Sequence, residues 1–238
     1  MAGHSKWANM KHRKERSDKK KGKIFSRITK EIISAVRQGG PDPKGNSKLR
    51  LAIQKAKDAN MPNENLDRNI KKAASSEGQD FFEMMYELYG YGGVGILVDI
   101  LSDNKNRISS EIHIATKEKG GSLAGPGSVS YNFERKGVFR LPKTCMAEDD
   151  LFFLVSEAGA EDFRAEEEHF LVVTSVENFG AVQDALHGAN IKPEEAALER
   201  VAKVLVEVSD EDANSNMALI EYLEDLDDVD AVFHNMKV

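Results

Sequence analysis

Basic side chains crowd the first 23 residues and define the clearest candidate chemistry in the sequence. Ten of them could contact phosphate groups, and Trp7 could stack on an unpaired base, a contact worth roughly 1–3 kcal/mol. Each neutralised phosphate releases counterions, so binding weakens with salt at a log–log slope of about −0.9 per contact on duplex DNA. The alternatives are a solvated tail and, for Trp7, an anchor on the protein. The ten are Lys6, Lys11, His12, Arg13, Lys14, Arg16, Lys19, Lys20, Lys21 and Lys23.

Candidate catalytic residues are scattered along the chain. The six histidines form no HExxH motif, and with a single cysteine there is no CxxC pair, so the sequence lacks a zinc-site pattern. Acidic clusters at 210–212 and 224–230 could hold Mg²⁺ for a nuclease, but a solvated acidic face is the more typical use of such clusters. We therefore expect no enzymatic activity, no catalytic or metal-binding residue, no cofactor and no small-molecule substrate.

The two ends of the chain carry opposite charge. Residues 1–72 hold 20 Lys/Arg and 7 Asp/Glu, a net charge of +13, whereas residues 73–238 hold 13 Lys/Arg and 33 Asp/Glu, a net charge of −20. The basic end should attract polyanions and the acidic remainder should be repelled by them. We expect nucleic acid to meet the molecule in one orientation.

Three amphipathic helices should hold the basic residues that follow the arm. Apolar residues recur at helical spacing around Ile32, Ala52 and Ile70, while Arg68, Lys71 and Lys72 face away from their stripe. Ser47 and Asn63 are the expected N-caps of the second and third helices. Only the turn at 60–63 is short enough for a helix-turn-helix. Basic residues on the outer faces of these helices extend the predicted phosphate contacts: Arg27, Lys30, Lys48 and Arg50.

A change to α/β patterning follows a linker at 75–79. Strands are expected at 84–90, 94–101 and 129–133, and a helix begins at Asn104 or Asn106 and ends at Gly120-Gly121. The pattern over residues 137–200 predicts the order strand, helix, strand, strand, helix, strand, which is the order of a ferredoxin-like unit. Further strands are expected at 203–208 and 230–235, with a helix at 213–226 between them.

These elements predict an α+β multidomain protein. A basic arm (1–23) precedes a three-helix bundle (24–78). A discontinuous α/β domain (79–135 plus 202–238) contains an inserted ferredoxin-like α/β domain (136–201). The arm has only Trp7 and Met10 as large apolar residues, so we expect it to be disordered or to fold on contact.

Each of two glycine-rich segments has both a functional and a structural interpretation. Residues 89–93 could present tyrosines to RNA, but a hairpin turn needing positive φ is favoured. Residues 120–127 could cradle a phosphate, yet the Lys-Ser/Thr ending of a P-loop is absent, which favours a helix C-cap followed by a flexible loop.

The cysteine content and the lengths of the apolar runs indicate the cellular compartment of the protein. Cys145 is the only cysteine, which excludes an intramolecular disulfide and fits a reducing environment. No apolar run approaches the ~18–20 residues that cross a bilayer, and no secretory h-region follows the basic start. We expect a soluble cytoplasmic protein without a membrane partner.

Long motifs carry a resemblance over nearly the whole chain. MAGHSKWANMKHRK (1–14), YELYGYGGVGILVDILSDNKNR (86–107), GGSLAGPGSVSYNFERKGV (120–138) and LEDLDDVDAVFHN (223–235) resemble the YebC/PmpR family. The resemblance implies three domains and a transcriptional regulatory protein that binds DNA. It also implies an alternative, a ribosome-associated translation factor that contacts ribosomal RNA and relieves stalls at proline-rich stretches. Promoter DNA and ribosomal RNA, with the ribosome itself, therefore stand as the expected partners.

Overall fold

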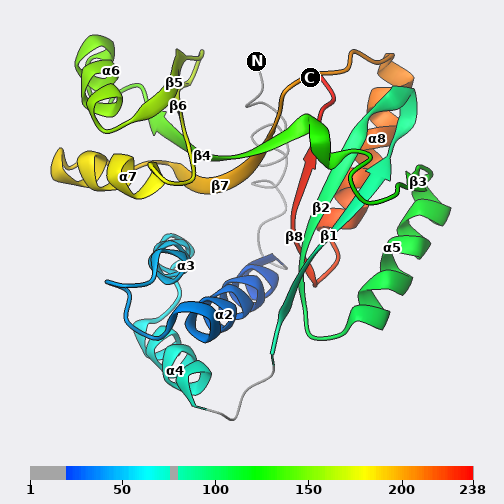
Figure 1. Ribbon diagram of the computed structural model, residues 1–238, viewed down its shortest axis with the longest axis horizontal. Coiled ribbons are helices and arrows are strands. Elements are labelled where there is room, and N and C mark those ends of the chain that lie inside the picture. The colour runs from blue at the N-terminus through cyan, green and yellow to red at the C-terminus, as the bar shows by residue number, and fades with distance from the viewer. Residues whose placement is uncertain (1–19, 76–79, 238) are drawn as a thin grey trace. The chain divides into compact units, whose positions relative to one another are not determined.

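The computed structural model describes residues 20–75 and 80–237. The chain forms two compact units. The first comprises residues up to Asn132 together with Val204–Val238, and the second comprises Phe133–Lys203. Each unit is described by itself below, with the element labels of Figure 1. The arm predicted at 1–23 lies outside the described residues except at its end, because α2 begins at Lys20 and residues 20–23 are helical.

From residue 20 onward, the described part of the first unit begins with three helices. They are α2 (Lys20–Gly39), α3 (Ser47–Asp58) and α4 (Asn63–Ala74). Helix α2 packs against both of the others, and the predicted apolar stripes form their shared core. The stripes are apolar at intervals of three and four residues, so each helix buries one face and leaves its polar side chains outside. Buried members of this core are Ile28, Ile32, Ala35, Val36, Leu49, Ala52, Ala56, Met61, Leu66 and Ala73.

Asn46 links the first two helices. The sequence predicted Ser47 as the N-cap of α3, but Ser47 is the first helical residue and Asn46 is the cap. The Oδ1 atom of Asn46 accepts from the backbone N–H of Leu49 at 3.0 Å, and its Nδ2 donates to the carbonyls of Ala35 and Gly40 at 2.8 and 2.9 Å. Likewise Pro62 occupies the cap position predicted for Asn63, without a side-chain cap bond.

Replacing Asn46 with alanine should lower the free energy of unfolding of the bundle by about 2–3 kcal/mol, because a cap, one buried bond and one partly buried bond are lost together. Hydrogen exchange of the α2 and α3 amides measures this change. The exposed Ser47→Ala variant is the matched control and should change stability by less than about 0.5 kcal/mol. A larger effect of Ser47→Ala than of Asn46→Ala would contradict this assignment.

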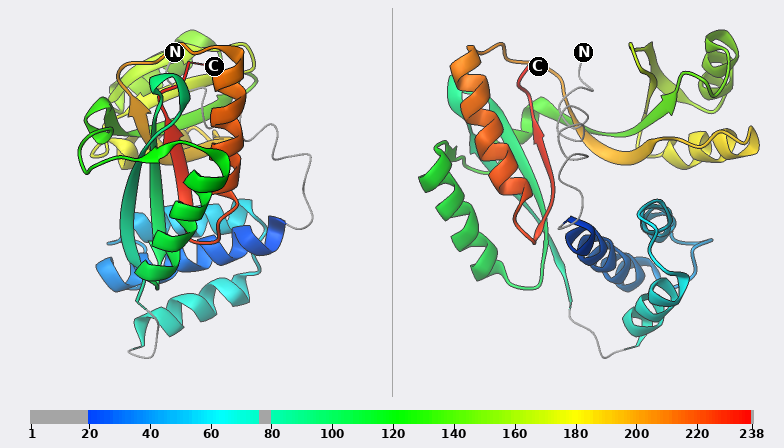
Figure 2. Two further views of the ribbon diagram at one scale, coloured as in Figure 1. Left: turned by 90° about the vertical axis from the view of Figure 1, so that its right-hand side faces the viewer. Right: turned by 180° about the vertical axis from the view of Figure 1, so that it is seen from behind.

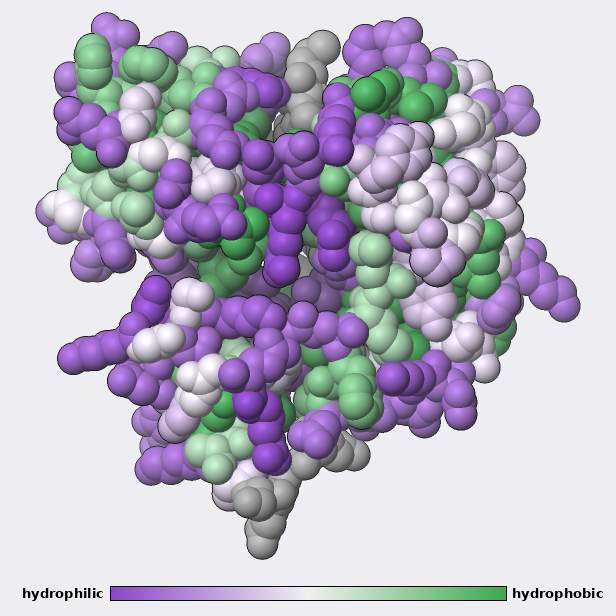
Figure 3. All heavy atoms as spheres, in the orientation of Figure 1, coloured by the Kyte–Doolittle hydropathy of each residue, from purple (hydrophilic) through white to green (hydrophobic). Residues whose placement is uncertain are grey.

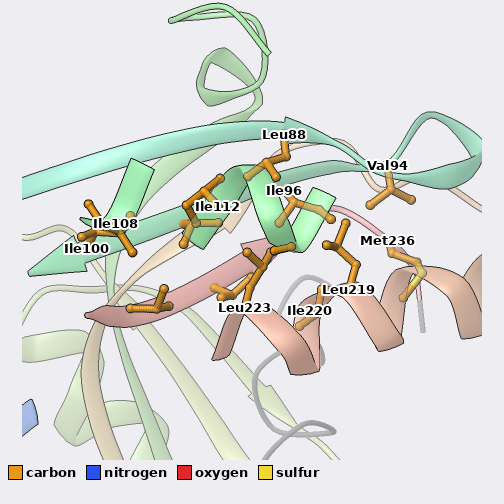
Figure 4. Close-up of a cluster of buried hydrophobic side chains, with 14 residues drawn as sticks. Leu88, Val94, Ile96, Ile100, Ile108, Ile112, Leu219, Ile220, Leu223 and Met236 are labelled. Carbon is orange, nitrogen blue, oxygen red and sulfur yellow. The ribbon is translucent and has the colours of Figure 1, made fainter. Parts of the chain in front are cut away.

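A four-stranded antiparallel sheet forms the rest of the first unit, in the order β3-β1-β2-β8. Helices α5 and α8 cover one face of this sheet, and a continuous apolar core lies between them and the strands (Figure 1, Figure 4). Strand β8, near the C-terminus, pairs with β2, so the end of the chain completes the sheet, as the sequence predicted. The elements are β1 (Phe82–Tyr89), η2 (Tyr91–Gly93), β2 (Gly95–Ser102), α5 (Lys105–Lys119), β3 (Ser122–Leu123), η3 (Ser130–Asn132), α8 (Asp210–Glu224) and β8 (Val229–His234).

Two predicted strands are wrong. Residues 129–132 form a loop and the short helix η3, because the carboxylate of Glu87 accepts the backbone N–H groups of Val129 and Ser130. Residues 203–208 form no strand beyond a single bridge at Val206. The N–H and carbonyl of Val204 pair instead with the side chain of Asn132, at 3.0 and 2.9 Å, so they are not available to a neighbouring strand.

The second unit is ferredoxin-like, as predicted. Its elements follow the order βαββαβ, and its antiparallel sheet has the order β5-β6-β4-β7, seen from behind in Figure 2. Phe139 of the central strand stacks on Phe179 of a covering helix, with ring centroids 4.6 Å apart. The elements are β4 (Phe133–Pro142), α6 (Glu148–Glu157), β5 (Ala160–Ala165), β6 (His169–Thr174), α7 (Phe179–Gly188) and β7 (Glu195–Ala202).

Candidate nucleic-acid interface

Most of the predicted arm residues lie outside the described part of the chain. Lys20 and Lys21 begin α2, but their side chains also lie outside it. The structure therefore places five of the predicted contacts: Lys23, Arg27 and Lys30 on α2, and Lys48 and Arg50 on α3. The predicted contacts without a described backbone are Lys6, Trp7, Lys11, His12, Arg13, Lys14, Arg16 and Lys19.

The three α2 residues contact protein rather than solvent alone. Lys23 donates to the carbonyl of Asp225 at 2.5 Å, Arg27 donates to those of Glu224 and Leu226, and Lys30 donates to that of Asp227 at 3.1 Å. These carbonyls lie at the C-terminus of α8 and just after it, where a helix leaves carbonyls unpaired and carries partial negative charge. One basic face of α2 thus caps α8.

Asp228 is the centre of a charged network beneath this contact. It is 2% exposed and accepts hydrogen bonds from Lys30 at 2.5 Å, from the hydroxyl of Ser102 at 2.8 Å and from Nε of Arg107 at 3.0 Å. Burial alone would raise the pKa of Asp228, but the bonds from Lys30, Arg107 and Ser102 outweigh it and lower the pKa. Asp228, one member of the acidic cluster considered for Mg²⁺, therefore already accepts hydrogen bonds from three protein side chains.

One basic residue of the bundle forms an ion pair between two of its helices. Lys55 of α3 lies 2.8 Å from the carboxylate of Glu31 on α2. Burial raises the pKa of Glu31, Lys55 lowers it and Asp230 raises it, and the net pKa is about 6. Lys55 is thus a packing partner of α2 and not a free cation.

The two α3 residues named from the sequence remain exposed. Lys48 donates to Gln38 at 2.7 Å and to Glu83 at 3.0 Å, and Arg50 donates to the carbonyls of Pro43 and Lys44 at 2.8 and 2.9 Å. The exposed Lys48–Glu83 ion pair contributes about 0–1 kcal/mol, so exchanging this carboxylate for a phosphate costs little.

Helix α4 presents a basic face whose outward orientation the sequence predicted, although its residues were not among the named phosphate contacts. Arg68, Lys71 and Lys72 are exposed at spacings of three and four residues, so they lie together on one side of the helix. Arg68 donates to the side-chain oxygen of Asn65 at 3.0 Å. The amphipathic pattern around Leu66 and Ile70 was the signal, because it turns these cations outward. We call Arg68, Lys71 and Lys72 the α4 basic face.

The end of the glycine-rich loop, at Gly127, and the residues just after it bind an internal carboxylate. The carboxylate of Glu87 accepts from the N–H groups of Gly127, Val129 and Ser130 at 2.7, 2.7 and 2.8 Å. Burial would raise the pKa of Glu87, but these backbone bonds lower it. An internal carboxylate therefore occupies the anion-binding geometry of the loop.

Two features of the described residues bear on nucleophilic and metal chemistry. Burial raises the pKa of the Cys145 thiol, the opposite of what an activated nucleophile needs. Within residues 20–75 and 80–237, no group of three or more His, Cys, Asp or Glu side chains is arranged to hold a metal ion. In the same residues, no helix has the length and apolar character to cross a membrane.

Family models match two stretches that together span most of the chain. Residues 5–76 match the TACO1/YebC protein N-terminal domain, and residues 81–236 match the TACO1/YebC second and third domain. The chain belongs to the TACO1/YebC family. The resemblance stated from the sequence motifs is confirmed.

Relatives of this TACO1/YebC protein are named as regulators. A probable transcriptional regulatory protein of Protochlamydia amoebophila is 58% identical over 238 residues, covering 100% of this chain and 97% of the relative. One from Chlamydia muridarum is 53% identical over 237 residues, covering 99% of this chain and 100% of the relative. The family is thus of a regulatory type and not a known enzyme family.

A solved structure shares the fold of this TACO1/YebC chain. The crystal structure of a conserved hypothetical protein from Aquifex aeolicus is 40% identical and has a TM-score of 0.84. The match covers 92% of this chain and 91% of that one. The α+β architecture, with helices first and sheet domains after them, is therefore shared.

Proposed function

We propose that this protein is a non-enzymatic, cytoplasmic regulator that binds nucleic acid through its N-terminal third and thereby regulates transcription. The observation that carries the proposal is the charge split of +13 against −20, together with an exposed basic face on α4. The regulatory names of relatives that match over their full length support it.

Phosphate contacts dominate the proposed binding. Lysines of the arm supply the first set of contacts, and the α4 basic face, with Lys48 and Arg50, supplies the second. Lys23, Arg27 and Lys30 join only where phosphate displaces the end of α8. Contacts of this kind position a protein on the backbone but carry no sequence information of their own.

Base recognition is expected to be limited. Helices α3 and α4 each pack mainly against α2, which is not the mutual packing of a helix-turn-helix pair. Recognition of backbone and shape suits structured RNA as well as duplex DNA. Ribosomal RNA is therefore the second candidate target. Binding to it would correspond to a role on the ribosome at proline-rich stretches.

Affinity measured against salt tests the proposal. Binding of the full chain to duplex DNA and to a structured ribosomal RNA fragment should weaken steeply between about 50 and 200 mM salt. A flat response would overturn the electrostatic mechanism. Preference for a promoter over random DNA at fixed salt would favour transcription, whereas co-sedimentation with ribosomes would favour the second candidate.

Combined replacement of Lys19, Lys20 and Lys21 with alanine should weaken binding to all sequences alike. The segment that contains these lysines has few apolar residues, so the free energy of unfolding of the protein should change by less than about 0.5 kcal/mol. Parallel binding and denaturation measurements check both halves of the expectation. Loss of affinity for one sequence only would indicate base readout instead of phosphate contact.

A further inference from the structure

The ferredoxin-like unit is acidic, in contrast to the N-terminal third. Residues 133–203 hold 15 Asp/Glu and 8 Lys/Arg, a net charge of −7. A surface with this charge repels the phosphates of nucleic acid and of anionic lipids. Any partner of this unit should therefore be neutral or basic.

Helix α6 of this unit exposes two adjacent aromatic rings. Phe152 is 47% exposed and Phe153 is 65% exposed, although the helix buries Leu151 and Val155 completely. Hydrophobic and hydrophilic spheres alternate over α6 in the upper left of Figure 3. Burying an exposed phenylalanine in the core is normally favourable, so a pair left in water marks a surface that another apolar group can cover.

The core of the unit holds the two rings in place. Phe153 packs edge-on against Phe152 at 5.9 Å, Phe152 packs edge-on against Phe163 at 5.8 Å, and Phe163 stacks on Phe170 at 5.5 Å. This row of rings runs from the exposed helix face to a buried strand residue. The core thus orients Phe152, and Phe153 packs on Phe152; a ring held in this way lowers the entropic cost of binding.

Acidic side chains border the rings along α6. Glu148, Asp149 and Asp150 are exposed in its first turn and Glu157 is exposed in its last. Carboxylates at a helix N-terminus stabilise the helix, but one in the last turn opposes the helix dipole. Helix stability therefore does not account for Glu157, which lies one turn after Phe153.

We infer that Phe152 and Phe153, with their acidic border, form a docking site for a basic protein segment that presents apolar side chains between lysines or arginines. The aromatic pair supplies apolar contact and the carboxylates select positive charge. The site does not depend on the proposed nucleic-acid binding. It would give the protein a protein-binding end opposite in charge to its N-terminal third.

A labelled 18-residue helical peptide of leucine and lysine, with leucines on one face, is the probe. Fluorescence anisotropy should show binding to the full chain that weakens about fivefold or more in Phe153→Ser. Phe153 is largely exposed, so this variant should keep its fold, which hydrogen exchange of the unit verifies. Tyr131→Ser, which removes a 72% exposed aromatic from the first unit, is the matched control and should bind as the parent does.

Other outcomes would overturn the assignment. They are equal peptide affinity of Phe153→Ser and the parent chain, no peptide binding, or equal binding of a leucine–glutamate peptide. Loss of self-association in Phe153→Ser during sedimentation would make the surface a contact between copies of this chain. Photocrosslinks from position 153 that reach only nucleic acid would assign it to the other class of partner.

Discussion

Removing the α4 basic face, by replacing Arg68, Lys71 and Lys72 with alanine, should weaken nucleic-acid binding about 100-fold at about 0.15 M salt. Each lost phosphate contact removes about 0.9 from the log–log salt slope on duplex DNA, so the slope should become shallower by roughly 2.7. These side chains are exposed, and the bundle core beneath them is untouched. Titration of labelled DNA and RNA at several salt concentrations measures both quantities.

A matched variant separates local contact from net charge. Replacing Lys143, Lys192 and Lys203 with alanine also removes three positive charges, but from the ferredoxin-like unit. This variant should keep its salt slope and lose less than about threefold in affinity, because only the long-range field changes. Equal losses in the two variants would contradict a specific role for α4.

Replacing Asp228 with alanine should lower the free energy of unfolding of the first unit by about 2–3 kcal/mol. The change leaves Lys30 without its carboxylate and removes bonds from Ser102 and Arg107. Solvent reaches Arg107, so the cost stays below that of a fully buried pair. Hydrogen exchange in α2, α5 and β8 measures the loss.

The loss should depend on pH. The pKa of Asp228 is lowered on folding, so its contribution is present above the unfolded pKa of about 3.9 and disappears as pH falls through the folded value. The parent chain and Asp228→Ala should differ in stability from pH 5 to 8 and converge below about pH 4. The control is Asp227→Ala, where the side chain is 77% exposed and the change should stay under about 0.5 kcal/mol. A difference between parent and Asp228→Ala that persists at low pH would contradict the ionic network.

Periodicity made much of the fold predictable. The helical stripe through Ile28, Ile32 and Val36 repeats with the period of a helix, and the strand at His169–Thr174 is a short, nearly continuous buried run rich in β-branched residues, so local pattern sufficed to place both. The βαββαβ order fixed the ferredoxin-like topology because few connections of that order pack well. The alternation of apolar and polar residues at 129–133 is typical of a strand. The backbone N–H groups of Val129 and Ser130 instead donate to the carboxylate of Glu87, which is distant in sequence.

Long-range pairing limited the prediction of the candidate site. Charge patterning indicated that Arg27 and Lys30 face outward, but not that they meet carbonyls and a carboxylate about 200 positions away. No local pattern specifies such a partner, because it depends on where the end of α8 lies. For Arg68 and Lys71, outward orientation on an amphipathic helix was enough to place them on the surface.

Crosslinking in cells, followed by sequencing of the attached nucleic acid and mapping of the crosslinked residues, tests the central claim most directly. Crosslinks should concentrate within residues 1–74, including the arm and the α4 basic face, and should be reduced in the Arg68, Lys71 and Lys72 alanine variant. Promoter fragments or ribosomal RNA among the recovered sequences would identify the target. Crosslinks confined to residues 81–236, or no nucleic acid above background, would contradict binding through the N-terminal third.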